Sequence, residues 1–158
     1  MFEKVVVPLD GSKVGEAALP VVRRMAQNQP LGSKIHVTLI GVITLLRHWV
    51  VVGEASAPVS YTEEELNVIK NRITDYLEKT GEALKSDNID VSVMVASGNA
   101  AEEILKASDK IKADLIAMST HGRSGLRRLA FGSITDKVLR GSRIPVLMVR
   151  APEGTTNE

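Results

Sequence analysis

The sequence lacks cysteine altogether, and it has few aromatic residues and almost no net charge. Without a cysteine among its 158 residues, the chain has no disulfide, no thiolate for a metal and no cysteine nucleophile. Aromatic residues make up only 3% of the chain. Aliphatic side chains must therefore fill the core, and the stacking platforms that single-stranded nucleic acids use are not expected. A formal net charge of +1 argues against nucleic acid or a membrane surface as a partner.

The chain also lacks a long hydrophobic segment. Its longest uncharged apolar run, residues 37–46, is far shorter than the roughly 20 residues that a spanning helix needs. No secretory signal precedes the first apolar run, which begins at residue 4. The histidines are widely separated and show no metal-ligand spacing. We therefore expect a cytoplasmic protein that neither enters a membrane nor carries a histidine metal site.

Short apolar runs alternate with helical patterns along the chain. Strands are predicted at residues 4–9, 35–43, 89–95, 113–118 and 145–149, and helices at 12–27, 62–85, 100–111 and 133–140. This alternation predicts a parallel sheet with helices on both faces. Right-handed crossovers favour a doubly wound five-stranded α/β sheet with strand order 3-2-1-4-5. We expect a single domain over residues 1–150 and a flexible tail at 151–158.

Local signals mark where several of these elements begin. Ser12 is a plausible cap for the first helix, and Pro20 should kink that helix. Residues 62–65 form a capping box, and Asn99 should cap the helix that follows it. The long apolar connection at 44–61 either packs over the helices or a partner protomer, or serves as a lid or partner-binding patch.

In a sheet of this order, the winding direction reverses between the first and fourth strands. Ligands of open α/β sheets bind at such a point, outside the carboxyl ends of the strands. The first strand ends at Pro8 and Asp10, and the fourth ends at Met118 and Ser119. These polar segments should therefore face each other across a binding site.

The loop after Ser119 has the composition of a phosphate site. Gly122 permits close backbone approach, and Arg123 adds positive charge. Gly132 and Ser133 open a helix, whose free N–H groups and dipole attract an anion. Across the sheet, Asp10 could accept ribose hydroxyls or hold Mg²⁺ through water. The spacing is neither that of a P-loop nor that of a dinucleotide fingerprint.

Three stretches of the sequence resemble the universal stress protein family. They lie at residues 5–12, 118–133 and 144–149, so the resemblance covers about residues 3–150. The ATP-binding branch of that family carries G-x2-G-x9-G-[ST]. This chain reads Ser119-x2-Gly122-x9-Gly132-Ser133, so the spacing is intact and serine replaces the first glycine.

The resemblance implies a role for each matching position. Asp10 would contact the ribose, and the backbone of Val42 would hydrogen-bond the adenine. The Cβ of Ser119 could narrow the site, and its hydroxyl could instead help to bind phosphate. The residues that would line the phosphates are Gly122, Arg123, Gly132 and Ser133.

We therefore predict that the chain binds an adenine nucleotide, ATP or a related one, with Mg²⁺ held indirectly on Asp10. The resemblance implies a homodimer through residues 145–149, an apolar edge strand that would otherwise be exposed. Binding rather than catalysis is favoured, because no residue is clearly placed to orient a nucleophile. Two alternatives stay open. One is a slow ATPase or nucleotidyl-transfer enzyme using Asp10 and Arg123. The other is an interaction module that needs no nucleotide, with a protein partner that the sequence does not identify.

Overall fold

The computed structural model describes residues 2–44, 48–52, 55–59, 61–120, 132–152 and 154–155. A five-stranded parallel sheet has the order β5-β2-β1-β6-β7. Its strands are β1 (Lys4–Pro8), β2 (Ile35–Ile43), β5 (Ile89–Ser97), β6 (Leu115–Thr120) and β7 (Val146–Arg150). Counted along the chain, these strands have the order 3-2-1-4-5, so the predicted doubly wound α/β sheet is confirmed.

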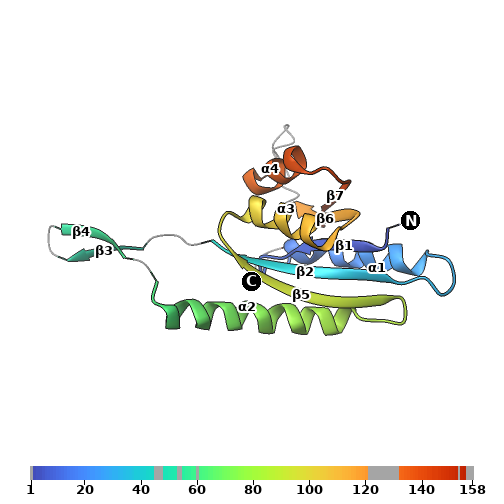
Figure 1. The fold of residues 1–158 in the computed structure, drawn as a ribbon, viewed down its shortest axis with the longest axis horizontal. Coiled ribbons are helices and arrows are strands. Elements are labelled where there is room, and N and C mark those ends of the chain that lie inside the picture. The colour runs from blue at the N-terminus through green and yellow to red at the C-terminus, as the bar shows by residue number, and fades with distance from the viewer. Residues whose placement is uncertain are drawn as a thin grey trace.

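Helices cover both faces of this sheet (Figure 1). A 3₁₀ helix η1 (Gly15–Ala18), α1 (Leu19–Gln27) and α2 (Glu63–Leu84) pack on one face. The opposite face carries α3 (Ala100–Ile111) and α4 (Ser133–Gly141). Buried residues of β1 alternate between the two resulting hydrophobic clusters, Val5 and Val7 in the first and Val6 in the second. This burial on both faces explains why β1 reads as a continuous apolar run.

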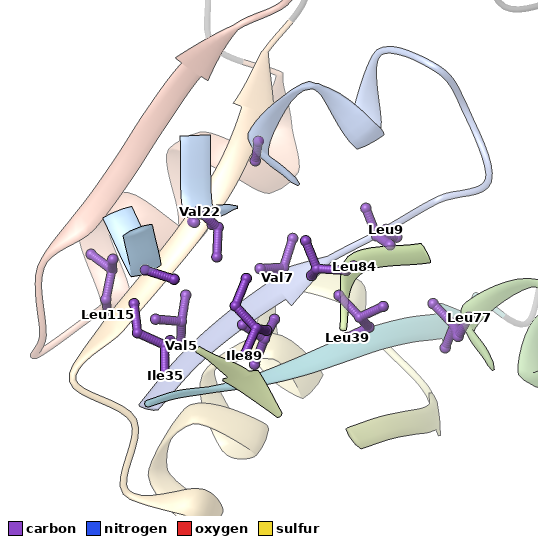
Figure 2. Close-up of a cluster of buried hydrophobic side chains, with 14 residues drawn as sticks. Val5, Val7, Leu9, Val22, Ile35, Leu39, Leu77, Leu84, Ile89 and Leu115 are labelled. Carbon is purple, nitrogen blue, oxygen red and sulfur yellow. The ribbon is translucent and has the colours of Figure 1, made fainter. Parts of the chain in front are cut away.

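The first cluster lies between α1, α2 and the sheet (Figure 2). Val22 comes from α1 and Leu77 from α2, and both side chains are fully buried against β1 and β2. Burying one such side chain stabilises the fold by about 1.5–3 kcal/mol. The cluster therefore fixes both helices on the sheet, and with them the segment that leads from β1 into α1.

The helix caps predicted at residues 62–65 and at Asn99 are confirmed. The Thr62 hydroxyl accepts from the Glu65 N–H at 3.2 Å, and the Glu65 carboxylate accepts from the Thr62 N–H at 2.8 Å. The Asn99 side chain accepts from the Glu102 N–H at 3.3 Å. Each cap satisfies N–H groups that have no partner inside the helix.

The first helix differs from the prediction of one helix over residues 12–27 with a kink at Pro20. A turn precedes the 3₁₀ segment η1, and the α-helix begins only at Leu19. Pro20 therefore lies in the first turn of α1. An N–H at that position would have no partner within the helix, so proline fits there without kinking it.

The long connection at 44–61 contains a hairpin that the sequence did not predict. β3 (His48–Val52) pairs with β4 (Ala55–Val59) in an antiparallel two-stranded sheet. Figure 1 shows this hairpin away from the five-stranded sheet and its helices, beyond the beginning of α2. The described residues of the connection therefore do not pack over the helices, which was one of the predicted alternatives; packing over a partner protomer, a lid and a partner-binding patch stay predictions.

β5 and β7 form the two edges of the parallel sheet. Residues 89–95 were predicted as an edge strand from their alternating pattern, and β5 confirms this. After β7 the chain stays on the sheet for one more residue, because the Ala151 N–H donates to the Thr120 carbonyl at 3.0 Å and Ala151 is buried. Within the described ranges, no helix has both the length and the hydropathy needed to cross a membrane.

Candidate functional site

β1 and β6 separate at the point where the winding direction of the sheet reverses. Their paired register covers Val5 with Leu115 and Val6 with Ile116. Both strands then continue, β1 to Pro8 and β6 to Thr120. The carboxyl ends of the two strands therefore lie beyond the last paired residues, as expected at a topological switch point, where open α/β sheets bind ligands.

Asp10 lies just past the end of β1, in a turn that is closed by its own side chain. Its Oδ1 accepts hydrogen bonds from the Ser12 N–H at 2.9 Å and from the Ser12 hydroxyl at 2.6 Å. Gly11 adopts a φ of 84° in this turn, a conformation that suits glycine. Asp10 is exposed. Among the described residues, both hydrogen bonds to its carboxylate fall on Oδ1, which leaves Oδ2 for a further donor.

Gly15 lies directly against this carboxylate. A Cβ placed on Gly15 would lie 2.5 Å from Asp10 Oδ1 and 3.3 Å from Ser12 Oγ. The Ser12 hydroxyl also accepts from the Gly15 N–H at 2.9 Å. The beginning of η1 and the Asp10 turn are thus packed as one unit, and only glycine fits at residue 15 without displacing Asp10.

The backbone of Val42 faces the side of β2 on which β1 has ended. Along a strand, the N–H and C=O groups of successive residues point alternately to the two neighbouring strands. The Ile40 carbonyl accepts from the Leu9 N–H at 2.9 Å, and the Ile43 carbonyl accepts from the Gly98 N–H at 3.0 Å on the β5 side. Val42 therefore points its N–H and C=O toward β1, whose pairing with β2 stops at Ile40. These two groups form a donor–acceptor pair beside the switch point.

The Ser119 side chain contacts η1. Its hydroxyl donates to the Gly15 carbonyl at 2.8 Å and accepts from the Ala18 N–H at 2.8 Å. Ala18 and Gly15 lie 101 and 104 positions before Ser119 in the sequence. The sequence suggests phosphate binding for this hydroxyl, whereas in the described part of the structure both of its hydrogen bonds go to the backbone of η1, a contact that the sequence did not predict. Met118, one residue earlier, is buried in the second cluster.

α4 begins on this side of the molecule with Gly132 as its N-cap. Within the described ranges no side chain makes a capping hydrogen bond to this helix, and Gly132 and Ser133 are exposed. A Cβ on Gly132 would meet no described atom within 4 Å. The first N–H groups of a helix attract anions through their free hydrogens and the helix dipole. The other two predicted phosphate residues, Gly122 and Arg123, lie outside the described residues.

Sequence reasoning missed a contact between α2 and η1. The Tyr76 hydroxyl donates to Glu16 Oε1 at 3.0 Å, and Lys13 pairs with the same carboxylate at 2.9 Å. Burial, together with the Glu16 carboxylate, raises the pKa of Tyr76 well above its ordinary value. Its phenol therefore stays protonated and donates at neutral pH. In the sequence, Tyr76 is only one residue of an amphipathic stripe, and nothing there identifies its partner.

Neither a metal-binding cluster nor the surface cavity beside β5 marks the switch point among the described residues. Across the described ranges, no three His, Cys, Asp or Glu side chains are grouped closely enough to hold a metal ion. Mg²⁺ held through water on Asp10 stays a prediction. A surface cavity of about 350 Å³ lies elsewhere, between the last turns of α2 and the edge strand β5, where Glu78, Glu82 and Ser92 are among its lining residues.

Comparison with known proteins identifies the family. The model of the universal stress protein family matches residues 1–150. The chain belongs to this family. The universal stress protein YxiE of Bacillus subtilis is 30% identical over 95% of this chain and 100% of its own length. The resemblance deduced from residues 5–12, 118–133 and 144–149 is thereby confirmed.

Solved structures of universal stress proteins share the fold. The structure of MJ0577, a universal stress protein of Methanocaldococcus jannaschii, superposes with a TM-score of 0.67 at 25% identity, covering 98% of this chain and 99% of that one. An Arabidopsis thaliana family member with bound AMP has a TM-score of 0.65 at 11% identity over 99% of both chains. A family member in complex with cAMP has a TM-score of 0.57 at 21% identity, covering 94% of this chain and 97% of that one.

Proposed function

We propose that this universal stress protein binds an adenine nucleotide, with ATP as the preferred ligand, at the carboxyl ends of β1, β2 and β6. The observation that carries the proposal is the separation of β1 from β6 beside the exposed Asp10. Two distantly similar proteins of the same fold hold AMP and cAMP, which supports an adenine nucleotide as the ligand class. The proposed nucleotide would extend from β2 across the end of β1 to α4.

Each part of the nucleotide has a matching chemical group in this arrangement. The N–H and C=O of Val42 would pair with the hydrogen-bonding edge of adenine, and Oδ2 of Asp10 would accept from the ribose hydroxyls. The first N–H groups of α4, at Gly132 and Ser133, would receive the phosphates. Gly122 and Arg123 belong to the proposed phosphate site on sequence grounds. Pro8, Met118 and the backbone of Ser119 would form its floor.

Asp10→Asn tests the ribose contact with little disturbance of the fold. Asparagine keeps an oxygen that can accept from Ser12, and it replaces Oδ2 by an N–H donor that cannot accept from a hydroxyl. We expect ATP affinity, measured by calorimetry with Mg²⁺, to fall about tenfold or more, as loss of a hydrogen bond to a charged group implies. Asp90→Asn is the matched control, because Asp90 is an exposed β5 residue paired with Lys34.

The proposal concerns binding, with turnover at background. Chromatography of the supernatant after denaturing the purified protein should identify a copurified adenine nucleotide. If the native protein releases none and calorimetry detects no binding of ATP, ADP or AMP with Mg²⁺, the proposed function is wrong. Hydrolysis that rises with protein concentration and disappears in Asp10→Asn would instead favour a slow ATPase.

We further infer a cytoplasmic homodimer that forms through β7. In the described part of the chain β7 pairs only with β6, and its residues 146–149 are half-buried on both faces. An apolar edge strand of this kind pairs readily with a second copy, because its outward N–H and C=O groups have no partner in the sheet. Light scattering should therefore give twice the mass of one chain.

A further inference from the structure

Ser119 occupies the first position of the nucleotide motif, where the ATP-binding pattern has glycine. Its hydroxyl bridges the two ends of one turn of η1, since it donates to the Gly15 carbonyl and accepts from the Ala18 N–H, each at 2.8 Å. Ser119 is half-buried, so water does not readily replace these bonds. The side chain thus fixes the 3₁₀ turn to β6, on the far side of the switch point from β2.

The same turn sets the position of Asp10. Gly15 is the residue whose absent Cβ leaves room for Asp10 Oδ1, at 2.5 Å from where that Cβ would lie. Its N–H donates to the Ser12 hydroxyl, which in turn donates to Asp10 Oδ1. A shift of η1 relative to β6 would therefore move the Asp10 carboxylate relative to the site.

A second contact holds η1 from the other direction. Tyr76 of α2 donates to Glu16 of η1 at 3.0 Å. α2 itself lies close to β2, because a Cβ on Gly41 would lie 2.5 Å from Ile73 Cγ2. The short helix is thus held between β6 through Ser119 and α2 through Tyr76, and it carries the Asp10 turn at its beginning.

We propose that Ser119 is a positioning residue: its hydroxyl locks η1 to β6 and so aims the Asp10 carboxylate at the ribose, and it does not bind phosphate. This inference rests on the proposed nucleotide site. It implies that restoring the family glycine, Ser119→Gly, weakens binding in this chain. If the serine merely narrowed the phosphate site, the same change would strengthen binding.

The test compares ATP with 2′,3′-dideoxy-ATP, which keeps the adenine and phosphates but lacks the ribose hydroxyls. We expect Ser119→Ala and Ser119→Gly to weaken ATP binding about five- to tenfold, the effect of one or two lost hydrogen bonds. Binding of the dideoxy nucleotide should change less than twofold. In Asp10→Asn the addition of Ser119→Ala should cost no further affinity, because the two changes remove the same contact.

Ser142→Ala is the matched control. The Ser142 hydroxyl also donates to one backbone carbonyl, that of Ile144 at 2.7 Å, and accepts from one N–H at 3.2 Å, but it lies at the end of α4. Its loss should leave both nucleotide affinities unchanged. Amide hydrogen exchange of Ala18, followed without nucleotide, should accelerate in Ser119→Ala and stay unchanged in Ser142→Ala. Tyr76→Phe, which loosens η1 from the α2 side, gives a second variant with an intact Ser119.

The outcomes separate the inference from the proposed function. Unchanged or tighter ATP binding by Ser119→Ala and Ser119→Gly overturns the inference alone. An equal loss of affinity for ATP and for the dideoxy nucleotide also overturns it, because such a loss would indicate a contact with the phosphates. Failure of the native protein to bind any nucleotide overturns both. If Ser119→Ala does not fold, Tyr76→Phe must show the same selective loss of ATP affinity, or the inference is wrong.

Discussion

Replacing Gly15 by alanine should weaken nucleotide binding while it leaves the fold nearly as stable. The new Cβ would lie 2.5 Å from Asp10 Oδ1, so the carboxylate must turn away by about 1 Å to reach an ordinary contact distance. That rotation breaks the bonds from Ser12, each worth about 1 kcal/mol net. Because Asp10 is exposed, water replaces part of the lost hydrogen bonding. Alanine also favours a helical backbone over glycine by about 1 kcal/mol, so the two effects nearly cancel in the free energy of unfolding.

The effect on binding is larger than the effect on stability. A hydrogen bond from a ribose hydroxyl to a fixed carboxylate is worth about 1.5–3 kcal/mol, so its loss lowers ATP affinity by about tenfold or more. Calorimetry gives the affinity, and urea unfolding gives the stability. Gly32→Ala is the opposite control, because Gly32 has a φ of 83° in a turn, where the new Cβ would meet no described atom beyond its chain neighbours within 4 Å. It should lose about 1 kcal/mol of stability and no affinity. Native affinity in Gly15→Ala would refute the assigned position of Asp10.

Four further changes test other parts of the molecule. Gly132→Leu should weaken ATP more than adenosine in calorimetry, because its side chain would cover the first N–H groups of α4; an equal effect on both ligands would contradict a phosphate contact there. Asp114→Ala should lower the free energy of unfolding in urea by about 1–3 kcal/mol, since its carboxylate accepts two N–H bonds at the start of β1, and a loss below about 0.5 kcal/mol would count against that role. Met148→Pro should give folded monomers in light scattering, because the Met148 N–H points away from β6 and toward the proposed partner strand. Leu147→Pro removes an N–H that faces β6, so it should impair folding. A dimeric Met148→Pro protein would exclude pairing through β7. Finally, a tyrosine absorbance titration should show a step far above the ordinary pKa of about 10, and this step should be absent in Tyr76→Phe. The stability that the Tyr76 phenol contributes should be present below about pH 10 and lost as the pH rises further.

The fold could be predicted because its determinants are local and periodic. β1 reads as a β-branched run, and its residues are buried on both faces, as a central parallel strand requires. The capping box at Thr62 and the cap at Asn99 locate the beginnings of α2 and α3 from a few residues each. Once the alternation of strands and helices was recognised, the right-handed crossover rule reduced the topologies to the one observed.

Two features escaped prediction for physical reasons. The hairpin of β3 and β4 includes the segment 55–59, in which alanine, serine and proline replace the β-branched residues that mark a strand. The start of α1 at Leu19 depends on η1, a 3₁₀ turn too short to leave a periodic signal. Residues 55–59 and 15–18 carry weak local preferences, and the surrounding chain decides their conformation.

In the candidate site, too, some positions could be predicted from the sequence and others could not. The position of Asp10 follows from the end of β1, and strand ends follow from the topology, so the sequence could place Asp10 beside the end of β6. The role of Val42 was implied only by the resemblance to the universal stress protein family. The link from Ser119 to η1 joins residues more than 100 positions apart, and no local pattern encodes it. The glycines of the nucleotide motif mark positions where the loop usually needs a flexible backbone. In this chain a hydroxyl stands at the first motif position, and both of its hydrogen bonds go to the turn that carries Asp10. The departure from the pattern is therefore explained by its contacts: Ser119 makes a fixed connection between β6 and η1. Glycine is still needed elsewhere in the site, at Gly11 for its φ of 84° and at Gly15 because a Cβ there would meet the Asp10 carboxylate.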